Sequence, residues 1–179
     1  MDPGHESSAR TEEPLTGWLT SLNAVLSRLA MYVACTSLAG LLAVVVYGVV
    51  LRYVFNDAPP YVEQVALLLI VSVAMFGASA GVRDAGHIGM DSLVRALPER
   101  WQFWCEAIVY ALIIFFALAL LAGGSEMAAS QRASTIPTLG VSEAIRYLPV
   151  GTAGILITLF SIEHLIALFS GKRVVPSWN

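Results

Sequence analysis

Three histidines and two cysteines are the residues of this chain best suited to metal binding or redox chemistry. His5 lies in the N-terminal tail, His87 follows one long apolar run, and His164 lies near the end of another. A haem-binding bundle needs axial ligands within its helices, and neither His87 nor His164 has a second histidine on its own run. Cys35 and Cys105 lie within apolar runs, as small hydrophobic core residues do. We therefore predict no haem, metal or other cofactor.

The common enzyme motifs give no sign of membrane catalysis either. We find no His-Glu-x-x-His pair that would bind zinc, and we expect no serine in the strand–turn–helix elbow that exposes a nucleophile. Ionisable groups inside a membrane usually mark functional sites, and no charge falls in the middle of the long apolar runs. We therefore predict that the chain is not an enzyme and has no catalytic residue.

The composition is that of an integral membrane protein. Of the 179 residues, 57% are hydrophobic and 13% are charged, and the mean hydropathy is +0.73. A soluble domain normally carries about 25% charged residues, so this chain has too little polar surface for water. Its net charge of −3 offers no basic face for nucleic acid. The expected surroundings are therefore a lipid bilayer.

Four long runs without a charged residue predict four membrane-spanning helices. A helix needs about 20 apolar residues to cross the hydrocarbon core, and in lipid its backbone amides must be paired within the segment. The expected fold class is an all-α integral membrane protein with four transmembrane helices, over about residues 29–51, 63–82, 104–125 and 147–169. The fourth run continues past Glu163-His164. This membrane domain would cover residues 29–170, between tails at 1–28 and 171–179.

Two segments outside these runs could lie along the membrane interface. Residues 15–29 place apolar side chains near helical spacing. They form either a short amphipathic interfacial helix or an extension of the first span beyond the bilayer. Residues 88–97 predict a second short amphipathic helix, which Pro98 ends. In the longest connection, residues 135–140 predict a turn before another short helix.

The distribution of Lys and Arg predicts the orientation in the membrane. Cytoplasmic segments carry an excess of these residues. The two tails and the connection between the second and third spans carry seven, against three on the other side: Arg10, Arg28, Arg83, Arg95, Arg100, Lys172 and Arg173, against Arg52, Arg132 and Arg146. We therefore expect both termini to be cytoplasmic.

Polar residues gather at the connection between the first two spans. Arg52 and Glu63 flank a hairpin turn that begins at Asn56. Pro59 or Pro60 can open the second helix, and Glu63 would then lie in its first turn, where the helix dipole favours an anion. Arg52 and Glu63 either pair across the hairpin or remain two separate solvated charges.

A second polar group follows the second span. Arg83, His87 and Asp91 recur at steps of four and would share one face of a helix, although nearby glycines favour a bend. Within the span, Gly77 and Gly81 have the small-xxx-small spacing that permits close helix approach. Ordinary small residues of a span are the alternative interpretation.

At these two groups the sequence resembles the small, DctQ-like membrane subunit of a tripartite ATP-independent periplasmic (TRAP) transporter. The motifs that carry the resemblance lie within residues 52–98: Arg52-Tyr53-Val54-Phe55-Asn56, the acidic start of the second helix, Phe76-Gly77, Arg83, His87-Ile88, Asp91 and Leu97-Pro98. The four-span layout extends the resemblance to about residues 24–170. Glu63-Gln64 departs from the two acids that the family often has there, and Gly89-Met90 departs from a polar residue and a valine.

The resemblance implies a non-catalytic subunit of the bacterial inner membrane. It would scaffold the large TRAP membrane subunit, which takes up an organic acid with sodium after a periplasmic solute-binding protein delivers it. Eight residues are the candidates for structure and assembly: Arg52, Asn56, Glu63, Gly77, Gly81, Arg83, His87 and Asp91. The alternative is a membrane-anchor subunit of a redox enzyme complex.

Overall fold

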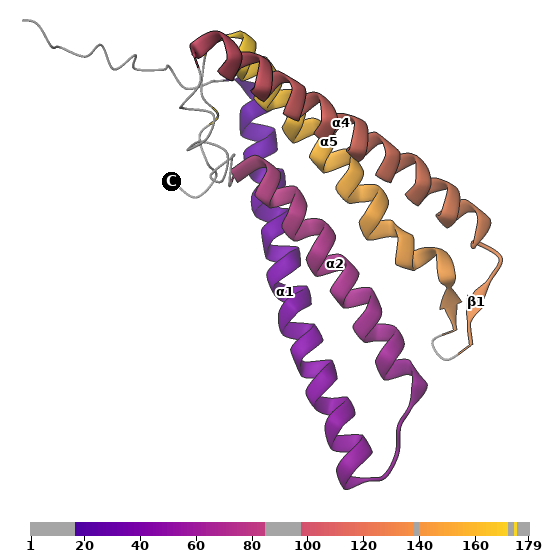
Figure 1. Ribbon diagram of the computed structural model, residues 1–179. Coiled ribbons are helices and arrows are strands. Elements are labelled where there is room, and N and C mark those ends of the chain that lie inside the picture. Colours follow the sequence, from indigo (N-terminus) through magenta and orange to yellow (C-terminus); the bar gives the residue numbers. More distant parts are fainter. Residues whose placement is uncertain (1–16, 85–97, 138–139, 172–173, 175–179) are drawn as a thin grey trace, which may run out of the picture.

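Four long helices dominate the part of the chain that the computed structural model describes, residues 17–84, 98–137, 140–171 and 174 (Figure 1). They are α1 (Trp18–Val54), α2 (Pro60–Asp84), α4 (Glu99–Ser130) and α5 (Leu148–Phe169). Each is long and apolar enough to cross a membrane. The predicted fold class, an all-α membrane protein with four spanning helices, is confirmed. The interfacial helix predicted over residues 88–97 lies outside the described residues.

The first helix is longer than the predicted span. α1 is continuous over 37 residues, so from Trp18 onward the segment predicted as interfacial belongs to the same helix as the first span. At a rise of about 1.5 Å per residue α1 is about 55 Å long, well beyond the hydrocarbon core of about 30 Å. Of the two interpretations of residues 15–29, the continuity of α1 from Trp18 favours an extension of the first helix.

The helices pack as two antiparallel hairpins, α1 with α2 and α4 with α5, and the hairpins contact each other mainly through α2 and α5. Figure 1 shows the hairpins close together where α1 begins and diverging toward their turns. Glycine permits the closest approach of α4 and α5. A Cβ on Gly154 would lie 2.9 Å from the carbonyl oxygen of Ala117, and one on Gly124 would lie 3.1 Å from the amide nitrogen of Gly151.

The two hairpin connections differ in length and structure. Between α1 and α2, Asn56 adopts a φ of 51°, a left-handed conformation that asparagine tolerates better than most residues. Between α4 and α5, strand β1 (Thr135–Ile136) pairs antiparallel with β2 (Val141–Ser142). A 3₁₀ helix, η1 (Glu143–Tyr147), then leads into α5. The predicted turn followed by a short helix is thus present in this connection.

The interior of the bundle is built from small side chains. Ala30, Ala80, Ala117 and Ala153 are buried, whereas no described leucine or valine is buried and many large apolar side chains face outward, as in a protein whose surroundings are apolar. Among the described residues Tyr110, Ile136 and Ile157 are also buried, and Phe160 is the large apolar side chain with no exposed surface. The other large side chains that are fully buried are polar or charged.

Candidate functional site

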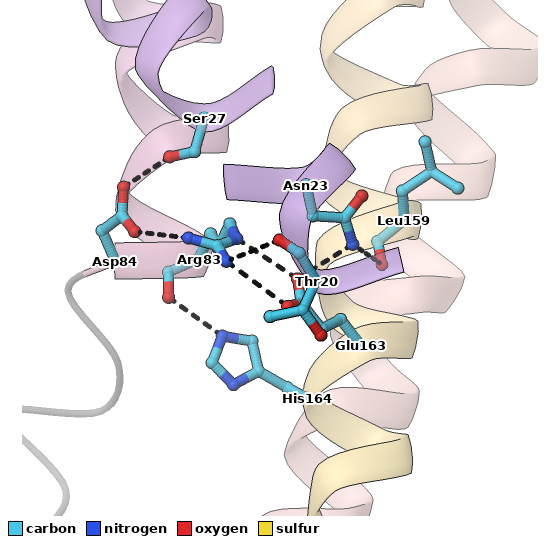
Figure 2. Close-up of polar contacts among 8 residues, drawn as sticks. All are labelled: Thr20, Asn23, Ser27, Arg83, Asp84, Leu159, Glu163 and His164. Carbon is cyan, nitrogen blue, oxygen red and sulfur yellow. Dashed lines mark hydrogen bonds and ion pairs between the residues drawn. The ribbon is translucent and has the colours of Figure 1, made fainter. Parts of the chain in front are cut away.

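A polar cluster is buried at the end of the bundle where α1 begins and α2 ends (Figure 2). It contains residues from three helices: Asn23 and Ser27 of α1, Arg83 and Asp84 of α2, and Glu163 and His164 of α5. We call it the Arg83–Glu163 cluster. Arg83 is 2% exposed and Glu163 is 0% exposed. Both charges are therefore removed from solvent.

Helical spacing brings the α1 members into the interior. The buried residues of α1 are Asn23, Ser27, Ala30, Ala34 and Ser37, which recur at steps of three and four and so form one stripe along the helix. Leu22, Val25 and Leu29 lie on the outward face. α1 therefore turns its small and polar side chains inward and its large apolar side chains outward.

Arg83 and Glu163 form a two-point ion pair between α2 and α5. Arg83 Nε lies 3.2 Å from Glu163 Oε2, and Nη2 lies 3.4 Å from Oε1. The planar guanidinium group suits such a paired contact with a carboxylate. Arg83 Nη2 also donates to the carbonyl oxygen of Thr20, at 3.4 Å. One side chain of α2 thereby contacts both α1 and α5.

Both carboxylates of the cluster are fully engaged. Asn23 Nδ2 donates to Glu163 Oε2 at 2.8 Å. Arg83 Nη1 lies 3.0 Å from Asp84 Oδ1, and Ser27 donates to Asp84 Oδ2. Each carboxylate oxygen of Asp84 and Glu163 thus accepts at least one hydrogen bond from the chain itself. A buried charge needs hydrogen-bond partners of this kind to offset the loss of water.

His164 connects the cluster to α4, the long helix that carries none of the residues named above. Its Nε2 lies 3.0 Å from the carbonyl oxygen of Arg83. This carbonyl is in the last turn of α2, where backbone acceptors have no partner within the helix. The imidazole ring stacks on Tyr110 of α4, with 5.2 Å between ring centroids. All four long helices therefore meet at this cluster.

The chemistry of the cluster suits a structural role, in which its contacts hold the helices in place. The guanidinium group of an arginine is a hydrogen-bond donor only, and the carboxylates that face Arg83 are already hydrogen-bonded. Removing one partner of a buried ion pair costs about 3–5 kcal/mol, because the other charge is left buried alone. The cluster thus makes the four-helix arrangement depend on residues far apart in the sequence.

A second, exposed polar group lies at the opposite end of α1 and α2. Arg52 Nη2 lies 3.6 Å from Glu63 Oε1, with side chains 60% and 75% exposed. The structure thus brings these two predicted residues into contact, but in solvent-exposed surroundings. In the same region, Arg146 of η1 donates to Gln64 of α2 and lies 3.4 Å from Glu143. Gln64 stands where the family resemblance leads one to expect a second acid.

The two predicted glycines of α2 do not pack against the rest of the described chain. A Cβ on Gly77 or Gly81 would meet nothing within 4 Å. The segment Gly77-Ala78-Ser79-Ala80-Gly81 also has the Gly-x-Ser-x-Gly spacing of a nucleophile elbow. However, it lies inside α2, and Ser79 is buried and donates to the carbonyl oxygen of Phe76 at 2.8 Å. This serine is therefore held as part of a helix and not exposed as a nucleophile.

The remaining predicted residues have different outcomes. Arg83 belongs to the cluster, whereas His87 and Asp91 lie outside the described residues, so their shared face stays a prediction. Asn56 provides the left-handed turn residue of the first hairpin. Within the described ranges, no group of three or more His, Cys, Asp or Glu side chains could hold a metal ion.

Sequence reasoning missed five members of the cluster, which are Asn23, Ser27, Asp84, Glu163 and His164. The signal that could have found them is Glu163, an acid inside an otherwise apolar run, which calls for a buried basic partner. Asn23 and Ser27 also share a face at a step of four.

Comparison with known proteins gives a consistent picture. The family model of the DctQ component of tripartite ATP-independent periplasmic transporters matches residues 41–171. A protein assigned as a TRAP transporter small permease in Haemophilus influenzae is 25% identical over 139 residues, which cover 77% of this chain and 86% of that protein. The sialic acid TRAP transporter small permease SiaQ of Vibrio cholerae is 22% identical over 152 residues, covering 84% and 87%. The sialic acid TRAP transporter permease SiaT of Haemophilus influenzae is 26% identical over 147 residues, covering 78% and 24%.

Proposed function

Because this chain belongs to the DctQ family, the small permease components of TRAP transporters, we propose that it braces the large membrane subunit of such a transporter. In this proposal the large subunit takes up an organic acid together with sodium, and a periplasmic solute-binding protein delivers the acid. The chain itself neither binds nor moves the substrate. Membership of a transporter family leaves the alternative, a redox enzyme anchor, without support.

The Arg83–Glu163 cluster is the observation that carries the bracing role. A carrier normally places ionisable groups or broken helices at mid-depth, where they bind the cargo. Arg83 and Glu163 are the charged residues buried in the described part of the chain, and they bind each other near one end of the bundle. This arrangement favours a rigid helical support over a transport pathway.

The partner is inferred to be a larger permease. The match to SiaT occupies 24% of that protein, so a segment similar to this chain is joined there to a much longer permease polypeptide. In the present chain one face of α2 is suited to such a contact. Ala74, Gly77, Ala78 and Gly81 recur at helical steps, both alanines are exposed, and both glycines face open space. Small residues let helices approach closely in lipid.

The substrate class is supported by the names of relatives. Besides SiaQ and SiaT, the C4-dicarboxylate TRAP transporter small permease DctQ of Vibrio cholerae is 30% identical over 76 residues, 42% of this chain. The substrates in the names of these relatives, dicarboxylates and sialic acid, are all carboxylic acids. An organic acid is therefore the proposed cargo of the present transporter as well.

The proposed location is the bacterial inner membrane, with both termini and the Arg83–Glu163 cluster at the cytoplasmic end. The excess of Lys and Arg on that side supports this orientation. A single cysteine at Ala58, in a chain without Cys35 and Cys105, should react with an impermeant thiol reagent in whole spheroplasts. A cysteine at Ser170 should react only after lysis. The reverse pattern would contradict the orientation.

Reconstitution tests the function directly. Proteoliposomes that contain this chain alone should show no uptake of labelled organic acid, with or without a sodium gradient. Proteoliposomes that contain the large subunit and the binding protein should need the chain for rapid sodium-driven uptake. Uptake by the chain alone, or equal uptake without it, would contradict the bracing role.

A further inference from the structure

A pocket of about 320 Å³ lies between α1 and α2, at the end opposite the Arg83–Glu163 cluster. Away from the hairpin turn its lining is apolar and includes Val45, Val49 and Ala66. Toward the turn the lining includes the Arg52 and Glu63 side chains. The pocket therefore has an apolar part and one end that carries both a positive and a negative charge.

The charged end is open to a further partner. The Arg52 and Glu63 side chains are 60% and 75% exposed while their closest atoms lie 3.6 Å apart. An exposed ion pair of this kind contributes little to stability by itself. The guanidinium has five N–H donors in all, so Arg52 can bind an anion while it remains near Glu63.

The position along the helices matches the boundary between lipid tails and headgroups. The two charges lie where the apolar spans of α1 and α2 end. Tyr53 is largely exposed there, and the hydroxyl oxygens of Tyr47 and Tyr61 lie 3.1 Å apart. Tyrosines gather at this depth in membrane proteins. The apolar part of the pocket then falls in the hydrocarbon region.

We propose that this pocket binds a phospholipid whose headgroup carries a phosphate and a primary ammonium group, as in phosphatidylethanolamine. The phosphate pairs with Arg52, the ammonium group donates to Glu63, and an acyl chain lies along the apolar lining. Charge complementarity selects this headgroup. Glu63 repels a purely anionic lipid, and a choline headgroup has no N–H to donate to the carboxylate.

Native mass spectrometry of the full-length chain, purified in mild detergent and titrated with defined lipids, tests the proposal. Palmitoyl-oleoyl phosphatidylethanolamine should bind about fivefold more tightly than phosphatidylcholine or phosphatidylglycerol with the same acyl chains. A difference of this size is expected from one partly exposed charge contact. Glu63→Gln should abolish this preference, whereas Arg52→Gln should weaken the binding of all three lipids, because all three carry the phosphate. Ala66→Leu should weaken all three lipids, because the larger side chain fills the apolar part of the pocket.

Matched controls separate the pocket from general surface charge. Arg132→Gln and Glu126→Gln each remove one exposed charge outside the pocket lining, and both variants should keep the wild-type preference. Circular dichroism should show the same helix content in every variant compared. Equal binding of the three lipids to the wild type would overturn the proposal. So would a preference that persists in Glu63→Gln, an Arg52→Gln variant that binds all three lipids as tightly as the wild type, or tighter binding of phosphatidylglycerol.

The assembled transporter provides the last test. The same titration on the chain co-purified with its large subunit should retain the phosphatidylethanolamine adduct and its dependence on Arg52 and Glu63. Loss of the adduct on assembly would show that a segment of the partner, and not a lipid, occupies the pocket. That result would overturn the lipid assignment while leaving the bracing role intact.

Discussion

Glu163 of α5 is fully buried against Arg83 of α2, with Arg83 Nε 3.2 Å from Glu163 Oε2. The two residues lie 80 positions apart in the chain. Asn23 adds a donor from α1 at 2.8 Å from Glu163 Oε2, and the neighbouring His164 reaches α4 through its stacking on Tyr110. Glu163 thus connects α5 to α1 and α2, and its neighbour His164 connects α5 to α4.

Neutralising Glu163 should destabilise the bundle strongly. In Glu163→Gln the guanidinium of Arg83 loses its charged partner on α5 while it stays buried. We therefore expect the free energy of unfolding to fall by about 3–5 kcal/mol. Thermal unfolding in detergent, followed by circular dichroism, measures the loss. Glu143→Gln is the matched control, because Glu143 pairs with Arg146 in half-exposed surroundings and should cost up to about 1 kcal/mol. Equal losses in the two variants would contradict a structural role for the cluster.

The exposed pair of Arg52 and Glu63 should behave differently. We expect Arg52→Glu to lower stability by up to about 1 kcal/mol, because it places two acids at the hairpin. Adding Glu63→Arg should recover part of that loss by restoring opposite charges. A double-mutant cycle of unfolding free energies measures the coupling. Strictly additive effects would mean that the two side chains act separately despite their contact.

Replacing Gln64 by an acid should increase the stability of the chain. It accepts a hydrogen bond from Arg146, and both side chains are half-buried. A carboxylate at this position would add a negative charge opposite the guanidinium group of Arg146 and turn the hydrogen bond into an ion pair, so Gln64→Glu should stabilise the chain by up to about 1 kcal/mol. The gain should vanish in the presence of Arg146→Gln. A gain that survives that second change would have another cause.

The small face of α2 should be required for assembly and not for the fold of this chain. Gly77→Leu and Gly123→Leu each add a side chain where a Cβ has open space, so both variants should keep wild-type helix content and stability in isolation. Only Gly77→Leu should lose the large subunit in co-purification, because its side chain would enter the proposed contact. Equal recovery of the partner with both variants would place the contact elsewhere.

The sequence predicts the four spans well because lipid imposes a simple rule. Every backbone amide must be paired within its segment, so long apolar runs can only be helices. The helix ends are predicted less accurately from the sequence. Arg28 and Arg52 mark the limits of the first apolar run, yet both lie inside α1. A charged residue marks where the hydrocarbon ends, whereas a helix can continue through the headgroup region.

The buried cluster could be predicted only in part. The leucines and valines near the start of α1 indicate an apolar face, and in water that face would be turned inward. Here Val25 and Leu29 face outward while Asn23 and Ser27 are buried, because lipid does not penalise exposed apolar side chains. Which polar groups pair is a matter of tertiary structure. The contact between Ser27 and Asp84 spans 57 positions, and no local spacing encodes it.

The most direct test of the bracing account is to remove all the charge of the cluster at once. Buried ion pairs can often be replaced by apolar residues of similar volume without loss of stability. The test therefore compares Glu163→Gln with a variant that carries Arg83→Met, Asp84→Asn and Glu163→Met together. The measurement is sodium-driven uptake by the reconstituted transporter, divided by the amount of assembled complex. If the cluster is only a joint, the triple variant recovers the complex that Glu163→Gln loses and transports at the wild-type rate per complex. A triple variant that assembles fully but takes up no substrate would contradict the account, because the charges would then take part in transport itself.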